Sequence, residues 1–302
     1  MKRVALIAGL ITSAALGMAT TAAEAKTLNV VASFSVLADV VKEVGGDHVV
    51  MKTLVGPNGD PHEFEPSPDD AKTLKTADVA FVSGEGLESW FSKLAKAAGY
   101  KGKPIVASEG IKTLKMEDEG KTVTDPHVWN SAANVVVWIG NIEKALSAAD
   151  PEDAADFKAS AARYAKEVQD LNAYAHEKLG AAPKDKRKIL TSHDAFGYFG
   201  KEYGVAFLSP LGVSTEKEAS AADVAKLINQ IKKEKVKAYF IENSNDPRLV
   251  KQVADATGAE PGGELYVESL SAPDGPAPTY AKMFRYNVDQ IAAAILKSAV
   301  SN

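Results

Sequence analysis

Residues 151–179 read PEDAADFKASAARYAKEVQDLNAYAHEKL. After Pro151 this stretch contains no glycine and no proline, and alanine, lysine and glutamate are frequent. Such residues lose little side-chain freedom in a helix, so the stretch predicts one helix roughly 40 Å long at about 1.5 Å per residue. Gly180 and Pro183 come next and predict where the helix ends.

On both sides of this stretch, short apolar runs alternate with segments of helical spacing. This alternation predicts parallel sheets covered by helices. We therefore expect an α/β fold: two lobes of parallel or mixed sheet flanked by helices and joined by one long rigid helix. The expected strands are residues 28–32, 49–54, 78–82, 105–107, 188–190, 205–208, 238–242 and 264–267. The expected helices are residues 34–44, 220–234, 247–257 and 279–298.

Local signals refine this outline. Ser67-Pro68-Asp69-Asp70 predicts a helix start, because it offers a serine cap, a proline in the first turn and carboxylates at the positive helix end. Residues 116–121 are expected to form a charged loop. We expect an N-terminal lobe over residues 26–150, a linking helix over 151–180 and a C-terminal lobe over 181–302.

Residues 1–25 have the pattern of a secretory signal peptide. Met1-Lys2-Arg3 is a short basic start, an apolar run extends to about Met18, and Ala23-Glu24-Ala25 is a small-x-small cleavage pattern. The alternative is an uncleaved membrane anchor, for which the apolar run is short. We expect cleavage after Ala25 and an exported, soluble protein in the periplasm.

Composition excludes several classes of function. The 302-residue chain has no cysteine, which rules out disulfides, thiolate metal sites, cysteine nucleophiles and a bacterial lipid anchor. Its formal net charge is −5 and it has no basic stripe, so nucleic acid is not an expected partner.

Three of the five histidines lie in short phrases that suit metal binding. His62 and His127 each follow an Asp-Pro pair, which predicts a turn or loop, and His193 follows the expected strand 188–190. Ligands of parallel sheets bind beyond the carboxyl ends of the strands, and imidazole is the commonest side-chain metal ligand. Glu268 directly follows the expected strand 264–267, so a cleft between two lobes would bring these four side chains together.

Other carboxylates lie near the same strand ends or histidines. Their commoner role is to cap helices or to orient imidazoles as hydrogen-bond acceptors. Trp129 is expected to belong to the core or to the wall of the cleft. The carboxylates are Glu63, Glu65, Asp194 and Glu242.

The phrases at residues 59–68, 125–129, 191–199 and 216–242 resemble the zinc/manganese substrate-binding proteins of ABC transporters (the cluster A-I, ZnuA/TroA-like family). The resemblance spans nearly all of the mature chain. It implies two α/β lobes joined by a long rigid helix, with a metal ion bound between the lobes by His62, His127 and His193. The family's fourth ligand is often an aspartate in an Asp-Ser-Leu phrase, and this chain has Glu268-Ser269-Leu270 there.

The resemblance also bears on which metal is bound. Manganese-type members commonly have glutamate in place of His193, and three imidazoles with one carboxylate suit tetrahedral zinc. Many zinc members carry a histidine-rich loop before the second motif, whereas residues 115–121 contain no histidine. We therefore expect Zn²⁺ as the transported ion, with Mn²⁺ or Fe²⁺ as the alternative.

The expected function is capture of Zn²⁺ in the periplasm and delivery to an inner-membrane ABC permease by a monomeric protein that is not an enzyme. A periplasmic metallochaperone is a candidate further partner. Acid should weaken binding, clearly so below about pH 6, because protonated imidazole cannot ligate.

Two other classes of function stay open at this stage. A zinc hydrolase needs three protein ligands and an open position for water, but His62-Glu63 lacks the second histidine of a His-Glu-x-x-His phrase. A metal-containing adhesin is disfavoured because the chain has no cysteine for a lipid anchor at the cell surface.

Overall fold

The computed structural model describes residues 27–118 and 121–300, so the expected signal peptide lies outside the described residues. Two separate four-stranded sheets and a two-stranded hairpin make up its strands. Within the described ranges, no helix is long and apolar enough to cross a membrane.

The first sheet has the strand order β2-β1-β3-β4 and is parallel throughout. Its central strand β1 is almost wholly buried, as its near-continuous apolar sequence requires of a strand covered on both faces. The strands are β1 Leu28–Phe34, β2 Val49–Val55, β3 Val79–Val82 and β4 Ile105–Val106. The helices of this part are α1 Ser35–Gly45, α2 Pro68–Lys75, α3 Phe91–Ala98 and α4 Ala132–Ala149, with 3₁₀ turns η1 Gly46–His48 and η2 Val128–Asn130.

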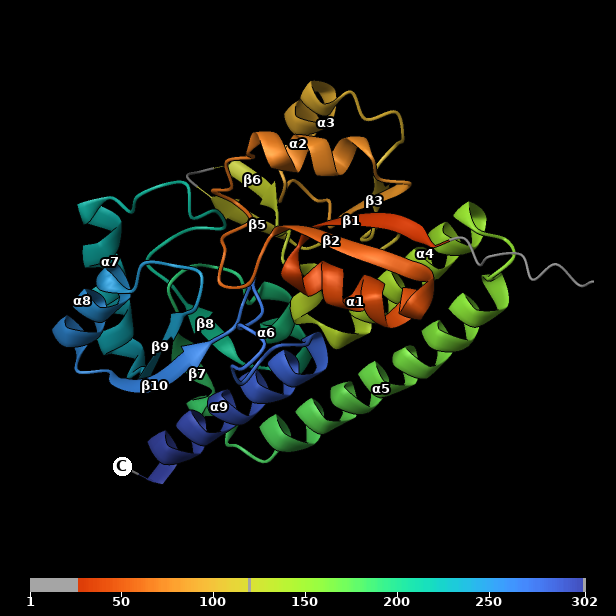
Figure 1. Ribbon diagram of the computed structural model, residues 1–302. Helices are drawn as coiled ribbons and strands as arrows, with labels where there is room; N and C mark the ends of the chain where they lie inside the picture. Colours follow the sequence, from red (N-terminus) through yellow and green to blue (C-terminus); the bar gives the residue numbers. More distant parts are fainter. Residues whose placement is uncertain (1–26, 119–120, 301–302) are drawn as a thin grey trace, which may run out of the picture.

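The second sheet has the order β10-β9-β7-β8 and is also parallel. Figure 1 shows it apart from the first sheet, with α7 and α8 on its outer side. The strands are β7 Lys188–Leu190, β8 Ala206–Leu208, β9 Ala238–Glu242 and β10 Glu260–Leu265. The helices are α6 Gly197–Tyr203, α7 Ala221–Glu234, α8 Arg248–Thr257 and α9 Tyr280–Val300, and η3 Lys184–Lys186 precedes β7.

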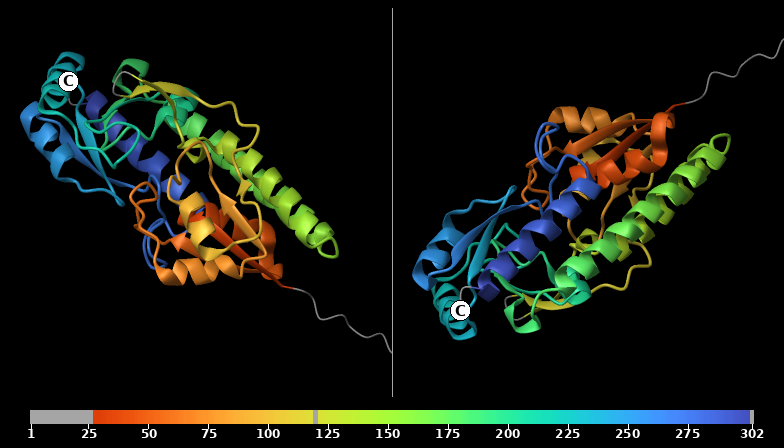
Figure 2. Two further views of the ribbon diagram at one scale, coloured as in Figure 1. Left: turned by 90° about the horizontal axis from the view of Figure 1, so that it is seen from above. Right: turned by 90° about the horizontal axis from the view of Figure 1, so that it is seen from below.

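One long helix, α5 Ala154–Gly180, connects the two sets of elements. It packs against α1, α4 and α9, and Figure 2 shows it running along the side of the molecule beside α9. The buried cation Arg187 donates to the carbonyl oxygens of Gly180 and Ala182 at 3.0 and 2.7 Å. A cation at this position stabilises the negative end of the helix, so the end of α5 is firmly held.

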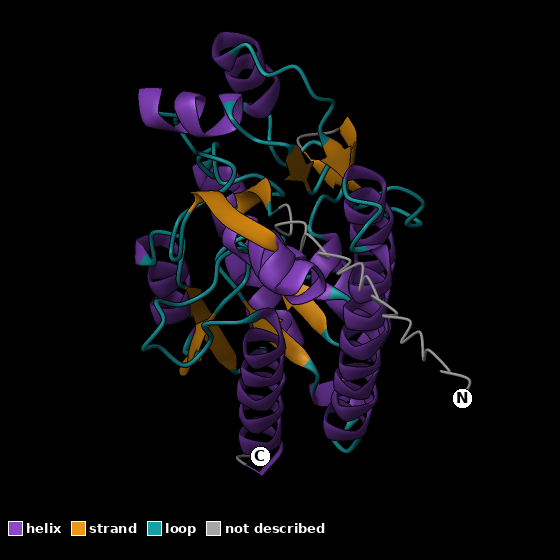
Figure 3. Ribbon diagram, turned by 45° about the vertical axis from the view of Figure 1, so that its right-hand side comes forward, coloured by secondary structure: helices purple, strands orange, loops and turns teal. Residues whose placement is uncertain are grey.

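The expected α/β class of the fold is confirmed by the two parallel sheets and their covering helices. The expected loop at residues 116–121 is wrong, because this region forms an antiparallel hairpin of β5 Lys115–Asp118 and β6 Lys121–Thr124 (Figure 3). β10 also begins earlier than expected and ends at Leu265, because an edge strand tolerates Pro261 and the bulge between Pro261 and Gly263. The short helices α3 and α6 were not predicted.

Candidate metal centre

The first expected ligand, His62, lies in the loop between β2 and α2. The Asp60 carboxylate accepts a hydrogen bond from the His62 backbone N–H at 2.7 Å. The indole N–H of Trp90 donates to the carbonyl oxygen of Pro61 at 2.8 Å. These two bonds fix the backbone on either side of the ligand, which is how a loop can hold a side chain as firmly as a strand does.

His127 repeats the same local arrangement just before η2. Asp125, two residues earlier, accepts from the His127 backbone N–H at 2.9 Å. The same oxygen, Oδ1, also lies 2.9 Å from the ring Nδ1. Nδ1–H therefore donates to Asp125, which leaves the lone pair of Nε2 available to a metal ion.

His193 follows the end of β7 and is held by Glu242 at the end of the neighbouring strand β9. Glu242 Oε1 accepts from the backbone N–H groups of Ser192 and His193 at 2.9 and 3.2 Å. Glu242 Oε2 lies 2.5 Å from the ring Nδ1 and also accepts from Asn245 Nδ2 at 2.6 Å. The ring is thus oriented with Nε2 facing away from Glu242.

The sequence predicted that Glu268 directly follows its strand. In the structure Glu268 lies three residues beyond the end of β10. Its segment is held on both sides by other parts of the chain. Trp129 Nε1 donates to the carbonyl oxygen of Val267 at 2.7 Å, and Ser35 Oγ accepts from the N–H of Leu270 at 3.0 Å. Trp129 is therefore a buried side chain that fixes the segment carrying Glu268.

The four expected ligands converge. Nε2 of His127 lies 3.2 Å from Nε2 of His62 and 3.4 Å from Nε2 of His193. Glu268 Oε1 lies 2.7, 3.1 and 3.3 Å from Nε2 of His62, His127 and His193. His62 is 6% exposed and the other three are 0% exposed. A tetrahedral ion with ligands at about 2.0–2.1 Å needs ligand atoms about 3.3–3.4 Å apart, which is close to this arrangement.

The electrostatics of the cluster also favour a cation. Burial alone lowers the pKa of His193, but Glu242 and then Glu268 outweigh burial and raise that pKa well above its usual value. Burial also opposes the charge on His127, yet Asp125 and Glu268 raise its pKa. Burial raises the pKa of Glu268, but His62 and His193 outweigh it and hold that pKa well below its usual value. Positive charge between the rings and the carboxylates is thus strongly stabilised.

One oxygen atom in the cluster lacks a hydrogen-bond partner among the described residues. Glu268 Oε2 is buried and has no hydrogen-bond partner. A buried carboxylate oxygen without a partner is costly, and coordination of a metal ion by this oxygen would remove that cost.

The other carboxylates considered from the sequence divide into two groups. Glu242 contacts His193, as a residue that orients an imidazole does. Glu63 and Glu65 are exposed and, like Asp194, they do not belong to the cluster of four. Asp125 was not predicted from the sequence, although the repeated Asp-Pro-His phrase was a signal, because an aspartate stands two residues before both His62 and His127.

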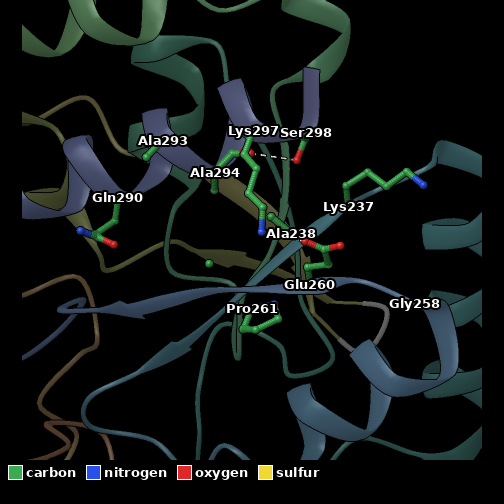
Figure 4. Close-up of a pocket in the computed structure, with 11 residues that line it drawn as sticks. Lys237, Ala238, Gly258, Glu260, Pro261, Gln290, Ala293, Ala294, Lys297 and Ser298 are labelled. Atoms are coloured by element: carbon green, nitrogen blue, oxygen red, sulfur yellow. Dashed lines mark hydrogen bonds and ion pairs between the residues drawn. The ribbon is translucent and has the colours of Figure 1, made fainter. Parts of the chain in front are cut away.

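Two further features lie outside this cluster. His48 bridges η1 to the start of α5, with Nδ1 2.6 Å from Asp153 and Nε2 3.4 Å from Asp156. Both ring nitrogens are occupied by carboxylates, which is the geometry of a tether. A pocket of about 280 Å³ lies against the C-terminal half of α9 (Figure 4), and an exposed Lys297–Glu260 ion pair lines it. Neither feature adds a ligand to the four residues.

Comparison with known proteins now identifies the family. Residues 30–294 match the family model described as zinc-uptake complex component A, periplasmic (ZnuA). The chain belongs to this family. It is a periplasmic metal-binding component of an ABC transporter, and the family is one of transporter substrate-binding proteins, not of enzymes.

Individual members of the family are named for different metals. The iron-binding protein YfeA of Yersinia pestis is 33% identical over 285 residues, which cover 94% of this chain and 91% of YfeA. The manganese ABC transporter substrate-binding lipoprotein PsaA of Streptococcus mitis is 33% identical over 283 residues, which cover 91% of this chain and 92% of PsaA. Among solved structures, the periplasmic zinc-binding protein TroA of Treponema pallidum superposes with a TM-score of 0.84 at 30% identity, covering 89% of this chain and 99% of TroA. The shared two-lobe α/β fold is thereby shown.

Proposed function

We propose that this protein captures Zn²⁺ with His62, His127, His193 and Glu268 and delivers it to an ABC importer. The observation that carries the proposal is the convergence of three imidazole Nε2 atoms and one carboxylate oxygen at near-tetrahedral spacing in a buried place. Imidazole nitrogens suit zinc, whereas carboxylate and water oxygens suit manganese. A nitrogen-rich set of four ligands also ranks zinc above manganese and iron in affinity.

The ring tautomers support the same proposal. Asp125 accepts a hydrogen bond from Nδ1–H of His127, and Glu242 accepts one from Nδ1–H of His193. In the neutral rings both Nε2 lone pairs therefore face the centre of the four-residue cluster. Zinc can therefore bind the neutral rings without a change of tautomer. Residues that hold imidazoles in this way are typical of metal sites.

Mn²⁺ or Fe²⁺ remains the second candidate cargo. The relatives named for manganese and iron favour it. The partnerless Glu268 Oε2 also favours it, because a bidentate carboxylate would raise the number of ligands to five, above the four that zinc prefers.

We further propose that residues 1–25 are removed on export and that the mature protein acts as a monomer. In this proposal residues 26–150 and 181–302 are the two lobes, and residues 151–180 are the linking helix. Since α5 packs along α1, α4 and α9, release of the ion would need movement of loops more than hinge bending. The partners would be an inner-membrane permease with its ATPase and, where one exists, a periplasmic metallochaperone.

A metal-competition experiment tests the proposed cargo. Metal-stripped protein is equilibrated with equal concentrations of Zn²⁺, Mn²⁺ and Fe²⁺ without oxygen, desalted and analysed for bound metal. One zinc per chain is expected, with loss of that zinc in His127→Ala. His176→Ala is the matched control, because His176 is an exposed histidine that pairs with Glu202 away from the site. Predominant manganese or iron in the wild type would reassign the cargo.

A further inference from the structure

Residues 209–220, between β8 and α7, form a loop that we name the strap; in Figure 1 it is the teal segment leading into α7. Its first half is attached to the loop that carries His193. The N–H of Leu211 donates to the carbonyl oxygen of Ser192 at 3.3 Å, and the N–H of Asp194 donates to that of Gly212 at 3.0 Å. Val213, next in the strap, is buried. The strap is therefore tied to one metal-site loop by backbone bonds on both sides of His193.

The second half of the strap reaches the other lobe. The hydroxyl of Thr215 donates to Asp60 Oδ2 at 2.7 Å, across 155 residues of sequence. Asp60 Oδ1 accepts from the backbone N–H of His62 at 2.7 Å. One carboxylate thus connects the strap to the backbone of a second ligand, with one oxygen serving each side.

The two attachments differ in strength. The His193 side is held by two backbone bonds and a buried valine. The His62 side is held through the hydroxyl of a half-buried threonine, and residues 216–218 beyond it lie at the exposed surface. The Thr215 end is therefore the end at which the strap can open without disturbing either sheet.

Other bonds join the loop after β2 to the C-terminal half of the chain. The N–H of Asn58 donates to the carbonyl oxygen of Leu270 at 3.1 Å, and Asn243 Nδ2 donates to Asn58 Oδ1 at 3.0 Å. They hold the segment that carries Glu268 against the loop after β2. Opening at Thr215 would leave these bonds in place, so the loop after β2 would stay attached to the Glu268 segment while it separates from the strap and the His193 loop.

We propose that the strap controls release of the bound ion and that Thr215 is its positioning residue, acting through Asp60 on His62. The inference rests on the proposed metal-binding function and goes beyond it by naming the contact that limits dissociation. While Thr215 holds Asp60, the loop that carries His62 is fixed and the ion is retained. When this bond breaks, the loop that carries His62 can separate from the strap and from the His193 loop tied to it, and the ion leaves.

The test measures how fast the ion dissociates. Wild type, Thr215→Val and Thr215→Ser are loaded with Zn²⁺ and mixed rapidly with an excess of a chromogenic chelator. Valine keeps the shape of threonine but removes the hydroxyl, and serine keeps the hydroxyl. Because a hydrogen bond to a charged group is worth about tenfold or more in an equilibrium constant, Thr215→Val should release zinc at least about tenfold faster. Thr215→Ser should stay within about twofold of the wild type.

A control variant separates the effect of the Thr215–Asp60 bond from a general effect of losing a threonine hydroxyl. Thr257→Val is a matched variant, because among the described residues the hydroxyl of Thr257 bonds to Val253 and Ala254 of its own helix, away from the strap. It should release zinc at the wild-type rate. Equal release rates in wild type and Thr215→Val would overturn the proposal, and so would fast release from Thr215→Ser. A wild-type protein that takes up no metal would instead refute the proposed function, and the strap proposal with it.

Discussion

Glu242 Oε2 lies 2.5 Å from Nδ1 of His193, on the opposite side of the ring from Nε2, which lies 3.3 Å from Glu268. The end of one strand therefore orients the ligand at the end of its neighbour. Because β9 and β7 are paired in the same sheet, the sheet itself sets the direction of the imidazole. The pairing of β7 with β9 therefore determines the orientation of one metal ligand.

Glu242→Gln should weaken zinc binding by about 10–100-fold while the protein stays folded, the usual cost of losing a residue that orients a ligand. The amide would present an N–H₂ group to one of the donors that the carboxylate now accepts from, so His193 would lose its tautomer or its orientation. Competition with a zinc chelator measures the change. Glu202→Gln, which alters the exposed pair with His176, is the control and should bind as the wild type does.

Zinc affinity should begin to fall at a higher pH than the ordinary histidine pKa of about 6.5 would give. The pKa values of His127 and His193 are raised in the metal-free protein by their carboxylate partners, and zinc must displace those protons. We expect the apparent affinity to decrease as the pH is lowered, already above pH 6.5. Titrations at several pH values check this, and unchanged binding at pH 4.5 would contradict a site of three histidines.

The same raised pKa values have a consequence for stability. A raised histidine pKa stabilises the metal-free protein below the unfolded-state pKa, and this contribution is lost as the pH rises through the folded-state pKa. Zinc binding has the opposite dependence on pH. The increase in melting temperature on adding zinc should therefore be larger at pH 8 than at pH 6, and a scan at both values would show it.

Glu268→Asp should reduce zinc affinity at least about tenfold, even though an aspartate is a chemically equivalent ligand. The shorter side chain would withdraw the oxygen that now lies 2.7–3.3 Å from the three Nε2 atoms, and a site loosened by about 1 Å loses much of its function. Glu268→Ala should cost more. Equal affinity in the aspartate variant would mean that the loop between β10 and α9 adjusts to the side chain it carries.

Asp39→Asn should make the protein less sensitive to pH. Burial, with Glu43 and Glu167 nearby, raises the pKa of Asp39 from 3.8 to about 7. The contribution of protonated Asp39 to the free energy of unfolding is therefore fully present below about pH 4 and is lost as the pH rises through about 7. Urea unfolding at pH 5 and pH 8 should show a larger loss of stability in the wild type than in the variant. An exposed control, Asp47→Asn, should behave as the wild type does.

The sequence predicted most accurately those features that local chemistry determines. Ser67 forms a capping box with Asp70 at the start of α2, as its phrase indicated. β1 and β9 lie where their apolar runs place them. The hairpin at residues 115–124 was missed because Lys115-Met116-Glu117-Asp118 has no apolar face that would mark a strand.

The site was predicted less completely than the fold, for a physical reason. The phrases around His62 and His127 are local, so their residues could be recognised. The contacts of His193 with Glu242 and of Val267 with Trp129 join residues that are far apart in the chain. Only the pairing of β7 with β9 and the packing of η2 beneath the segment after β10 bring them together, and no spacing in the sequence encodes these distances.

Isothermal titration of the metal-stripped mature protein with Zn²⁺, with Mn²⁺ titrated in parallel under the same conditions, tests most directly whether this is a zinc site. Tight one-to-one binding of zinc and much weaker binding of manganese are expected, since three imidazoles and one carboxylate line the site. Manganese binding as tight as that of zinc, or tighter, would contradict the claim that His193 makes this a zinc site.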